Sequence, residues 1–480
     1  MKFLETNPIS YNLTYSDVFM VPQLSDIESR FEVTLETPDA IGTTIPIVVA
    51  NMNAVAGKRM AETVARRGGL VVLPQDVPMD IITKNVAYVK KANPLYETPV
   101  TLGPDDTIAK ALDLIHKRSH KAVIVIDENR KPIGIFTERD ADGLDRFTRL
   151  HKVMSKNVFT LPQTITSKEA YEKLEAERLF MAPVVDDEGM LVGALTQKGA
   201  LRSDLYQPTL DADGKLSVAA AIGINGDPAA RACELVKLGV TVIVIDTAHG
   251  HQAKMLSAIK SVRKSLGSNI TIVAGNVATA DATRDLIAAG ANIVKVGIGP
   301  GAMCTTRMMT GVGRPQFSAV LECAAEAKKH GAHIWADGGI RHPRDVALAL
   351  AAGASNVMFG SWFAGTYESA ADMLQDADGR LYKENYGMAS RRAVRGRNEQ
   401  QNSYDRAKKE LFEEGISASR LYLNPHMSGV EDIIDHIVAG VRSSMTYAGA
   451  RTIEEFQDKA VVGIQTASGY SEGLPVPSSW

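Results

Sequence analysis

The sequence is poor in cysteine and in long apolar runs. Its three cysteines, Cys233, Cys304 and Cys323, are odd in number and lack the spacing of a disulfide framework or a zinc site. A reducing compartment is therefore the simpler expectation. No apolar run approaches the roughly 18 residues that a membrane helix needs, and residues 1–11 lack the apolar core of a signal peptide. We therefore expect a cytoplasmic protein with no membrane partner.

A strong charge of either sign is also missing. The 480 residues include 53 lysines and arginines and 56 aspartates and glutamates, which gives a formal net charge of -3. This balance offers no electrostatic reason to expect nucleic acid as a partner. A hydrophobic content of 45% and a charged content of 23% are typical of a soluble globular protein. At this length we expect two to four domains.

The sequence does contain a repeated alternation of strand-like and helical segments. Two buried strands, 45–51 and 69–73, flank a helical pattern over 58–67, and a further helix is expected over 79–91. After residue 217 six more strand-like runs follow, at 218–223, 240–246, 270–276, 291–297, 333–337 and 356–360. Eight such units with buried strands predict an α/β fold, a closed (β/α)8 TIM barrel. A doubly wound open sheet is the competing architecture, but no dinucleotide fingerprint follows the first strand.

Two related units interrupt this alternation of strands and helices between residues 93 and 206. Each contains a helical pattern, a short strand and a second strand that ends in threonine, and the copies lie about 60 residues apart. This duplication resembles a tandem pair of CBS modules. The resemblance implies that Thr137 and Asp140 hold the ribose of a regulatory purine nucleotide. In the second unit Thr196 is present but Gly199 replaces the carboxylate, and a structural pair that binds nothing is the alternative.

We therefore predict three parts of the chain. Residues 1–92 form the first part of the barrel with two strands, and residues 93–206 form the tandem CBS regulatory pair. Residues 207–480 form the rest of the barrel, a catalytic flap and a C-terminal segment. An insertion at this place is tolerated because it interrupts only a surface loop.

A glycine-rich turn over 297–307 holds one cysteine directly after a buried strand. Glycines let the backbone approach a ligand closely, and in a barrel this end of the strand carries the active site. Cys304 is therefore a candidate nucleophile, because backbone amides, Arg307 or a bound cation would favour its thiolate. A buried structural cysteine is the alternative.

The loops after the last two strands are also rich in small residues. Gly338 and Gly339 follow the seventh strand, and Gly360 and Ser361 follow the eighth. These two loops commonly bind phosphate in such barrels, and glycine turns leave backbone amides free to donate to it. The sequence therefore predicts a phosphate site here.

Several segments together resemble the family of IMP dehydrogenases and GMP reductases. They are residues 297–307, 310–316, 336–340, 386–390 and 414–415, and the similarity runs through nearly the whole chain. The resemblance implies that Cys304 attacks C2 of the purine while Thr306 and Glu414 serve proton transfer. The substrate-binding residues that it implies are Asp337, Gly339, Gly360, Ser361, Tyr386, Gly387, Met388 and Ser390.

The same resemblance implies further ligands. Asp246 and Asn276 would border the nicotinamide of the coenzyme. The backbone carbonyls of Gly299, Gly301 and Cys304 would hold a monovalent cation, K+. Members of the family assemble around a fourfold axis, so a homotetramer or octamer is expected.

The direction of the reaction is decided outside the cysteine loop. Dehydrogenases of this family activate water with an adjacent Arg-Tyr pair on a flap, whereas here Tyr404 and Arg406 are reversed and separated by Asp405. The segment 50–52, Ala-Asn-Met, looks like the reductase form of a segment that usually reads Ala-Ala-Met in dehydrogenases. Since a general base is worth on the order of 100- to 10,000-fold, its absence predicts an NADPH-dependent GMP reductase that forms IMP and ammonia.

Two alternatives to the reductase stay open at this point. One is a NAD-dependent IMP dehydrogenase that forms XMP, since familiar reductases lack the CBS insertion that this chain carries. The other is an inactive, nucleotide-sensing barrel, for which replacement of Cys304 would change nothing.

Overall fold

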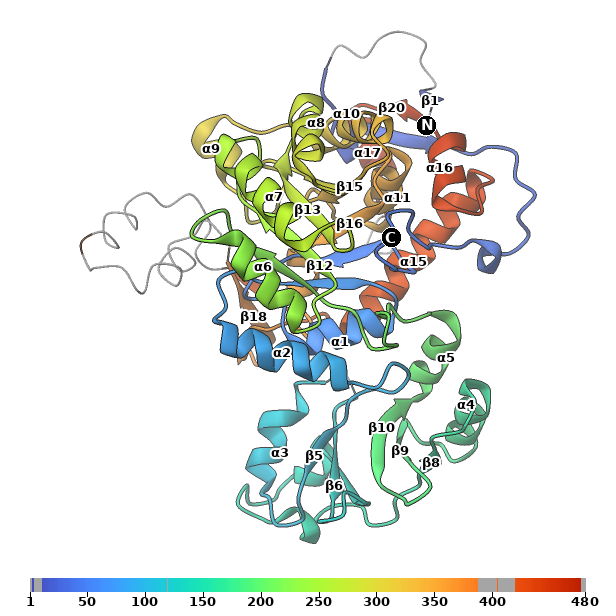
Figure 1. The fold of residues 1–480 in the computed structure, drawn as a ribbon. Coiled ribbons are helices and arrows are strands. Elements are labelled where there is room, and N and C mark those ends of the chain that lie inside the picture. The colour runs from blue at the N-terminus through green and yellow to red at the C-terminus, as the bar shows by residue number, and fades with distance from the viewer. Residues whose placement is uncertain (1, 4–10, 119, 387–403, 405–418, 476–480) are drawn as a thin grey trace.

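A closed barrel of parallel strands forms the centre of the molecule (Figure 1). The computed structural model describes residues 2–3, 11–118, 120–386, 404 and 419–475. The barrel strands in order are β3 (Ile47–Val49), β4 (Leu70–Leu73), β11 (Ala219–Ile222), β12 (Val242–Asp246), β13 (Thr271–Val277), β14 (Ile293–Val296), β15 (His333–Asp337) and β16 (Asn356–Phe359). Parallel pairing of β16 with β3 closes the ring. The predicted α/β fold and TIM barrel are confirmed.

The strands read as continuous apolar runs because both of their faces are buried. Val242 and Val244 on β12 point into the barrel, where they meet Ile293 and Trp335. The residues between them, such as Ile243, pack outward under the helices. Since neither face meets water, no polar alternation is needed along these strands. The strand β3 begins later than predicted because Pro46 has no amide to donate.

Helices cover the outside of the barrel (Figure 1). They are α1 (Lys58–Arg66), α2 (Met79–Lys91), α6 (Pro228–Lys237), α7 (Ala253–Leu266), α8 (Ala280–Ala289), α10 (Gln316–Lys329), α11 (Pro343–Ala351) and α15 (Val430–Tyr447). Local signals set several of their ends. The Asp227 side chain accepts from the Ala230 amide ahead of Pro228, and α8 runs from a Thr279 cap to Gly290 in the left-handed region.

The chain between α2 and β11 leaves the barrel and forms two small sheets (Figure 1). The first unit consists of β5 (Val100–Leu102), α3 (Ile108–Ile115), β6 (Ala122–Ile126) and β7 (Pro132–Thr137). The second consists of β8 (Leu161–Pro162), α4 (Ser167–Ala176), β9 (Met181–Val185) and β10 (Leu191–Thr196), and α5 (Gln197–Leu205) leads back. Ile124 and Met181 belong to one buried cluster that joins the two units. We call residues 93–206 the two-sheet segment.

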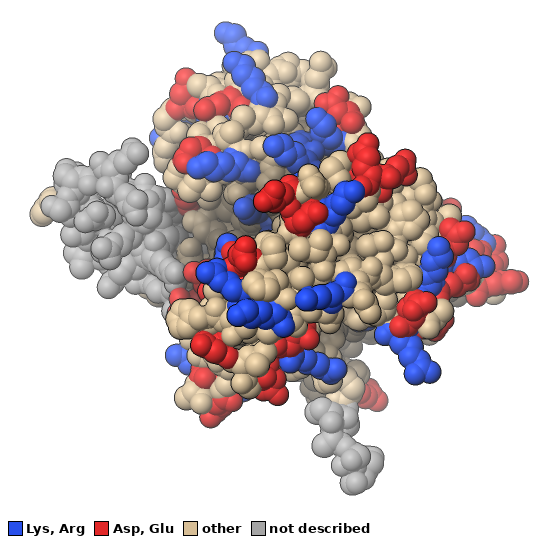
Figure 2. Space-filling view, turned by 90° about the horizontal axis from the view of Figure 1, so that it is seen from below, with Lys and Arg blue, Asp and Glu red and all other residues tan. Residues whose placement is uncertain are grey.

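Short elements complete the structure. They are the strands β1 (Lys2–Phe3), β2 (Val18–Val21), β17 (Met373–Gln375), β18 (Leu381–Asn385), β19 (Ser419–Tyr422) and β20 (Val461–Ile464), the α-helices α9 (Thr306–Thr310), α12 (Ser361–Ala364), α16 (Ile453–Lys459) and α17 (Ala467–Glu472), and the 3-10 helices η1 (Tyr15–Asp17), η2 (Arg30–Glu32), η3 (Glu138–Ala141) and η4 (Leu150–Lys152). Within the described ranges, no helix has both the length and the apolar character needed to cross a membrane. Basic and acidic side chains are interspersed on the face drawn in Figure 2.

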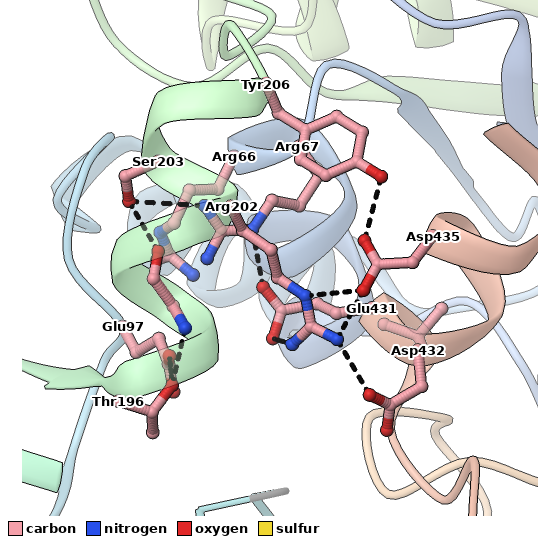
Figure 3. A network of polar contacts seen from close by, with 12 residues as sticks. Arg66, Arg67, Glu97, Thr196, Arg202, Ser203, Tyr206, Glu431, Asp432 and Asp435 are labelled. Atoms are coloured by element: carbon pink, nitrogen blue, oxygen red, sulfur yellow. Dashed lines mark hydrogen bonds and ion pairs between the residues drawn. The ribbon is translucent and has the colours of Figure 1, made fainter. Parts of the chain in front are cut away.

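A buried ionic network joins the two-sheet segment to the barrel (Figure 3). Arg202 on α5 donates to Asp432 at 2.7 Å and to Asp435 at 2.7 and 2.9 Å, and it lies 3.4 Å from Glu431. Arg67, just after α1, donates to the other oxygen of Glu431 at 2.6 Å. The three carboxylates all lie on the first turns of α15, so this helix is tied to both parts of the chain.

Candidate active site

The loop between β14 and α9 presents Cys304 at the carboxyl end of the barrel. The Cys304 amide donates to the carbonyl of Gly301 at 3.0 Å, and its side chain is exposed. The thiol donates to Oγ1 of Thr306, the first residue of α9, at 3.2 Å. Cys323, in contrast, is buried on α10, and burial raises the pKa of its thiol to about 11. Only Cys304 of these two is placed to meet a ligand.

Glycines shape this loop because neighbouring atoms leave no room for a side chain. Gly297 has a φ of +153°, and a Cβ there would overlap the backbone oxygen of Asp337. A Cβ on Gly299 or Gly313 would overlap the aliphatic part of the Arg307 side chain, which runs between them. The glycine spacing therefore serves the close packing of the loop around Arg307 and against β15.

A lysine holds two of the predicted carboxylates together inside the barrel mouth. Nζ of Lys295 on β14 lies 2.8 Å from Asp246 on β12 and 2.8 Å from Asp337 on β15. Burial alone would lower the pKa of the Lys295 amine, but the two carboxylates outweigh it and hold that pKa above its ordinary value. The three charged groups therefore form one ionised cluster.

Two asparagines extend the cluster. Nδ2 of Asn51, after β3, donates to Oδ2 of Asp246 at 2.9 Å. Nδ2 of Asn276 on β13 donates to Oδ2 of Asp337 at 2.9 Å and to the backbone oxygen of Gly297 at 2.7 Å. Asn276 thus connects the cluster to the first residue of the cysteine loop.

Sequence reasoning missed Lys295. A signal for it exists, because Ile293 and Lys295 share one side of β14 and Ile293 belongs to the apolar core inside the barrel. A lysine at an inward position of a buried strand needs an acidic partner. The identity of that partner depends on how the strands are arranged in space.

One of the two predicted phosphate loops lies beside the cysteine loop. Gly338 and Gly339 have φ values of +91° and +81°, and a Cβ on Gly338 would lie 3.1 Å from the Gly301 amide. A Cβ on Gly360 would lie 2.8 Å from the Met52 sulfur. Ser361 begins α12 and its hydroxyl accepts from Asn385 at 3.3 Å. Both loops are thus built for a close backbone approach.

Other predicted site residues are only partly described. Tyr386 directly follows β18 and is half-buried. Tyr404 is 76% exposed. Gly387, Met388, Ser390, Arg406 and Glu414 lie outside the described residues. In the described part of the chain, no group of three or more His, Cys, Asp or Glu side chains could hold a metal ion.

The two halves of the two-sheet segment differ at their matching threonines. The amide and hydroxyl of Thr137 donate to Oδ2 of Asp140 at 2.7 and 2.9 Å, so this pair caps η3. In the second unit the Thr196 hydroxyl donates to Oε1 of Glu97 at 3.0 Å, and a Cβ on Gly199 would lie 2.5 Å from that oxygen. Glu97 therefore fills the space beside Gly199.

His120 holds the Glu97 carboxylate in place. Its Nδ1 lies 3.6 Å from Glu97, and both side chains are buried. Burial alone would raise the pKa of Glu97, but His120, with help from Arg67 and Thr196, lowers it to about 2. The second unit thus contains an ionised internal carboxylate at the position that the first unit gives to Asp140.

Nearly the whole chain is similar to known proteins of one family. A family model described as the IMP dehydrogenase / GMP reductase domain matches residues 12–475. The chain belongs to this family. It is 57% identical to the GMP reductase of Mycobacterium tuberculosis over 480 residues, which is 100% of both chains. It is 39% identical to the inosine-5′-monophosphate dehydrogenase of Halalkalibacterium halodurans over 469 residues, 96% of this chain and 95% of the relative.

Solved structures give the same family. A GMP reductase variant from Trypanosoma brucei in complex with guanosine 5′-monophosphate matches with a TM-score of 0.70 at 32% identity, over 99% of this chain and 100% of that chain. The GMP reductase of the same organism in complex with guanosine 5′-triphosphate matches with a TM-score of 0.59 at 30% identity, over 95% and 98%.

Proposed function

We propose that this protein is a GMP reductase, which converts GMP to IMP and ammonia with NADPH. The exposed Cys304 thiol at the barrel mouth, 3.2 Å from the Thr306 hydroxyl, supports the covalent chemistry, and the full-length similarity to a reductase carries the choice of direction. The full-length relative at 57% identity is a reductase, whereas the dehydrogenase relative shares 39%. The reductase prediction from the flap sequence is therefore favoured over IMP dehydrogenase.

The chemistry suits the residues at this site. The Cys304 thiolate adds to C2 of GMP, and the exocyclic amino group leaves as ammonia once it is protonated. Thr306, whose hydroxyl lies 3.2 Å from the Cys304 sulfur, would serve that proton transfer together with Glu414, both by resemblance. NADPH, when bound, supplies the hydride that C2 receives as the carbon–sulfur bond breaks. Cys304 is thereby regenerated as a thiolate, and IMP carries the new hydrogen at C2.

Asp337 is suited to bind the ribose hydroxyls. Its Oδ2 accepts from both Lys295 and Asn276, which fixes the carboxylate plane. Oδ1 has no partner among the residues that the structure describes, and it is left to accept from a ligand. Gly339, Gly360 and Ser361 would bind the phosphate through backbone amides, and Tyr386, Gly387, Met388 and Ser390 join them by resemblance.

The coenzyme would lie beside Asp246 and Asn276. Oδ1 of Asn276 is buried and has no hydrogen-bond partner within the described residues. A buried amide oxygen without a donor is unfavourable, and the carboxamide of a nicotinamide would supply one. This orphan acceptor fits the predicted cofactor, with Asp246 on the neighbouring strand.

A monovalent cation such as K+ would bind the cysteine loop. The carbonyls of Gly299, Gly301 and Cys304 are the oxygen donors that such an ion takes, and the 3.0 Å bond from Cys304 to Gly301 folds the turn back on itself. The ion would hold the loop conformation and take no part in the covalent steps.

The two-sheet segment would act as a CBS regulatory pair with one purine nucleotide site. Thr137 and Asp140 would bind the ribose by resemblance to CBS modules, with the Thr137 hydroxyl 2.9 Å from Oδ2 of Asp140. The corresponding turn of the second unit contains Glu97 instead, which would repel an anionic nucleotide. The division of the chain at 93 and 206, a homotetramer or octamer and a cytoplasmic location stay predictions.

A direct assay tests the proposal. Purified protein with GMP and NADPH should lose the reduced-nicotinamide absorbance and form IMP and ammonia in equal amounts. Formation of XMP from IMP and NAD would instead establish the dehydrogenase. A Cys304→Ala variant should bind GMP without turnover, and unchanged behaviour of that variant would point to the inactive barrel.

A further inference from the structure

We propose that Lys295 is a positioning residue that couples the coenzyme side of the site to the nucleotide side. Its ammonium group bridges two carboxylates on either side of it, Asp246 and Asp337, at 2.8 Å each. The inference rests on the proposed function, because that function assigns Asp246 to the nicotinamide and Asp337 to the ribose. No role for Lys295 follows from the cysteine chemistry itself.

The barrel register makes this bridge possible. Asp246 is paired with Gly275, and Gly275 with Lys295, across three adjacent parallel strands. A Cβ on Gly275 would lie 2.6 Å from the Lys295 Cβ. The missing side chain on the middle strand therefore gives the lysine its space and lets it reach Asp246 two strands away.

The bridge leaves Asp246 and Asp337 in different states. Both oxygens of Asp246 are engaged, Oδ1 by Lys295 and Oδ2 by Asn51. Asp337 is held through Oδ2 alone. Both oxygens of Asp246 are therefore held by protein groups, whereas Asp337 keeps one oxygen for a ligand.

Charge balance is the second consequence. With Lys295 present, the cluster of one cation and two carboxylates carries a net charge of one negative unit. Without it, two like charges face each other in a mostly buried site, and an anionic nucleotide would bind beside them. Lys295 is 3% exposed, so water cannot replace it as a screen. Removal of the ammonium should weaken nucleotide binding even though Lys295 need not touch the nucleotide.

The test measures GMP binding by calorimetry in the full-length protein. Lys295→Met keeps the length of the side chain and removes its charge, and we expect at least a tenfold loss of GMP affinity. Adding Asp246→Asn restores the native net charge, so the double variant should regain at least a third of the lost affinity on a logarithmic scale. A purely structural role for Lys295 would give no rescue, because a second deletion only removes more contacts.

Lys90→Met is the matched control. Lys90 on α2 forms a 2.6 Å ion pair with Asp211 outside the barrel, and its loss should leave GMP affinity within twofold. Equal affinity of Lys295→Met and wild type, or a double variant no better than the single, would overturn the coupling. If Lys295→Met does not fold, the double variant must fold and bind GMP. Because GMP binding is measured without turnover, the effect of Lys295 on affinity can be interpreted even if the reductase assay fails.

Discussion

Replacement of Arg202 by methionine tests how the two-sheet segment is held to α15. The Arg202 side chain is 7% exposed and meets three carboxylates. Breaking a buried ion pair commonly costs about 3–5 kcal/mol, because the remaining charge stays buried and unpaired. Here each carboxylate keeps another partner, with Arg67 at 2.6 Å from Glu431, Lys198 at 3.0 Å from Asp432 and the Tyr206 hydroxyl at 2.8 Å from Asp435. We therefore expect a loss of about 2 kcal/mol.

Native-state hydrogen exchange is the suitable assay, since a chain of several parts need not unfold in one step. A loss of about 2 kcal/mol should accelerate exchange of the α5 amides about 30-fold. Lys198→Met is the control: this side chain is 64% exposed and pairs with Asp432, so we expect a loss of at most about 0.5 kcal/mol. A loss above about 4 kcal/mol for Arg202→Met would show that the second partners do not compensate, and one below about 0.5 kcal/mol would show that the network does not hold α5.

Three further predictions concern the site and its support. Thr306→Val should lower turnover about 100-fold with GMP affinity unchanged, while Thr306→Ser keeps most of the activity; equal rates for the two variants would remove Thr306 from proton transfer. Gly297→Ala should cost about 2 kcal/mol in thermal unfolding and reduce turnover, because its Cβ would overlap the Asp337 carbonyl; an unchanged melting temperature would contradict the packing. Glu97 has a pKa lowered from 4.5 to about 2, so its stabilisation is complete above about pH 5 and disappears as the pH falls toward 2. The difference in unfolding free energy between wild type and Glu97→Gln should follow that curve and be absent near pH 2.

The sequence alone determined the barrel and placed the ends of its strands to within two residues. The helix α2 and the strand β15 begin and end at the predicted residues. These boundaries were predictable because they follow from the local spacing of apolar residues. The glycine-rich loop of Cys304 and the reversed order of Tyr404 and Arg406 were equally readable, since each is a short contiguous pattern.

The polar connections of the site were decided by the tertiary structure. Asn51 and Asp246 are separated by 195 residues and meet because the strands that precede Asn51 and contain Asp246, β3 and β12, belong to one closed barrel. The sequence did not indicate the two partners of Lys295. Alternation along a strand predicts that the Lys295 side chain points into the barrel, but the register between strands decides which side chains it meets there.

In the second unit of the two-sheet segment, a polar contact also depends on residues far apart in the sequence. The sequence showed that Gly199 lacks the carboxylate of Asp140, and it offered no replacement. Glu97 supplies one from 99 residues away from Thr196, across the fold. Short-range patterns thus identified the barrel and a candidate nucleophile. Charge pairing between distant segments required the closed structure, because a carboxylate ionises and orients according to what surrounds it in space.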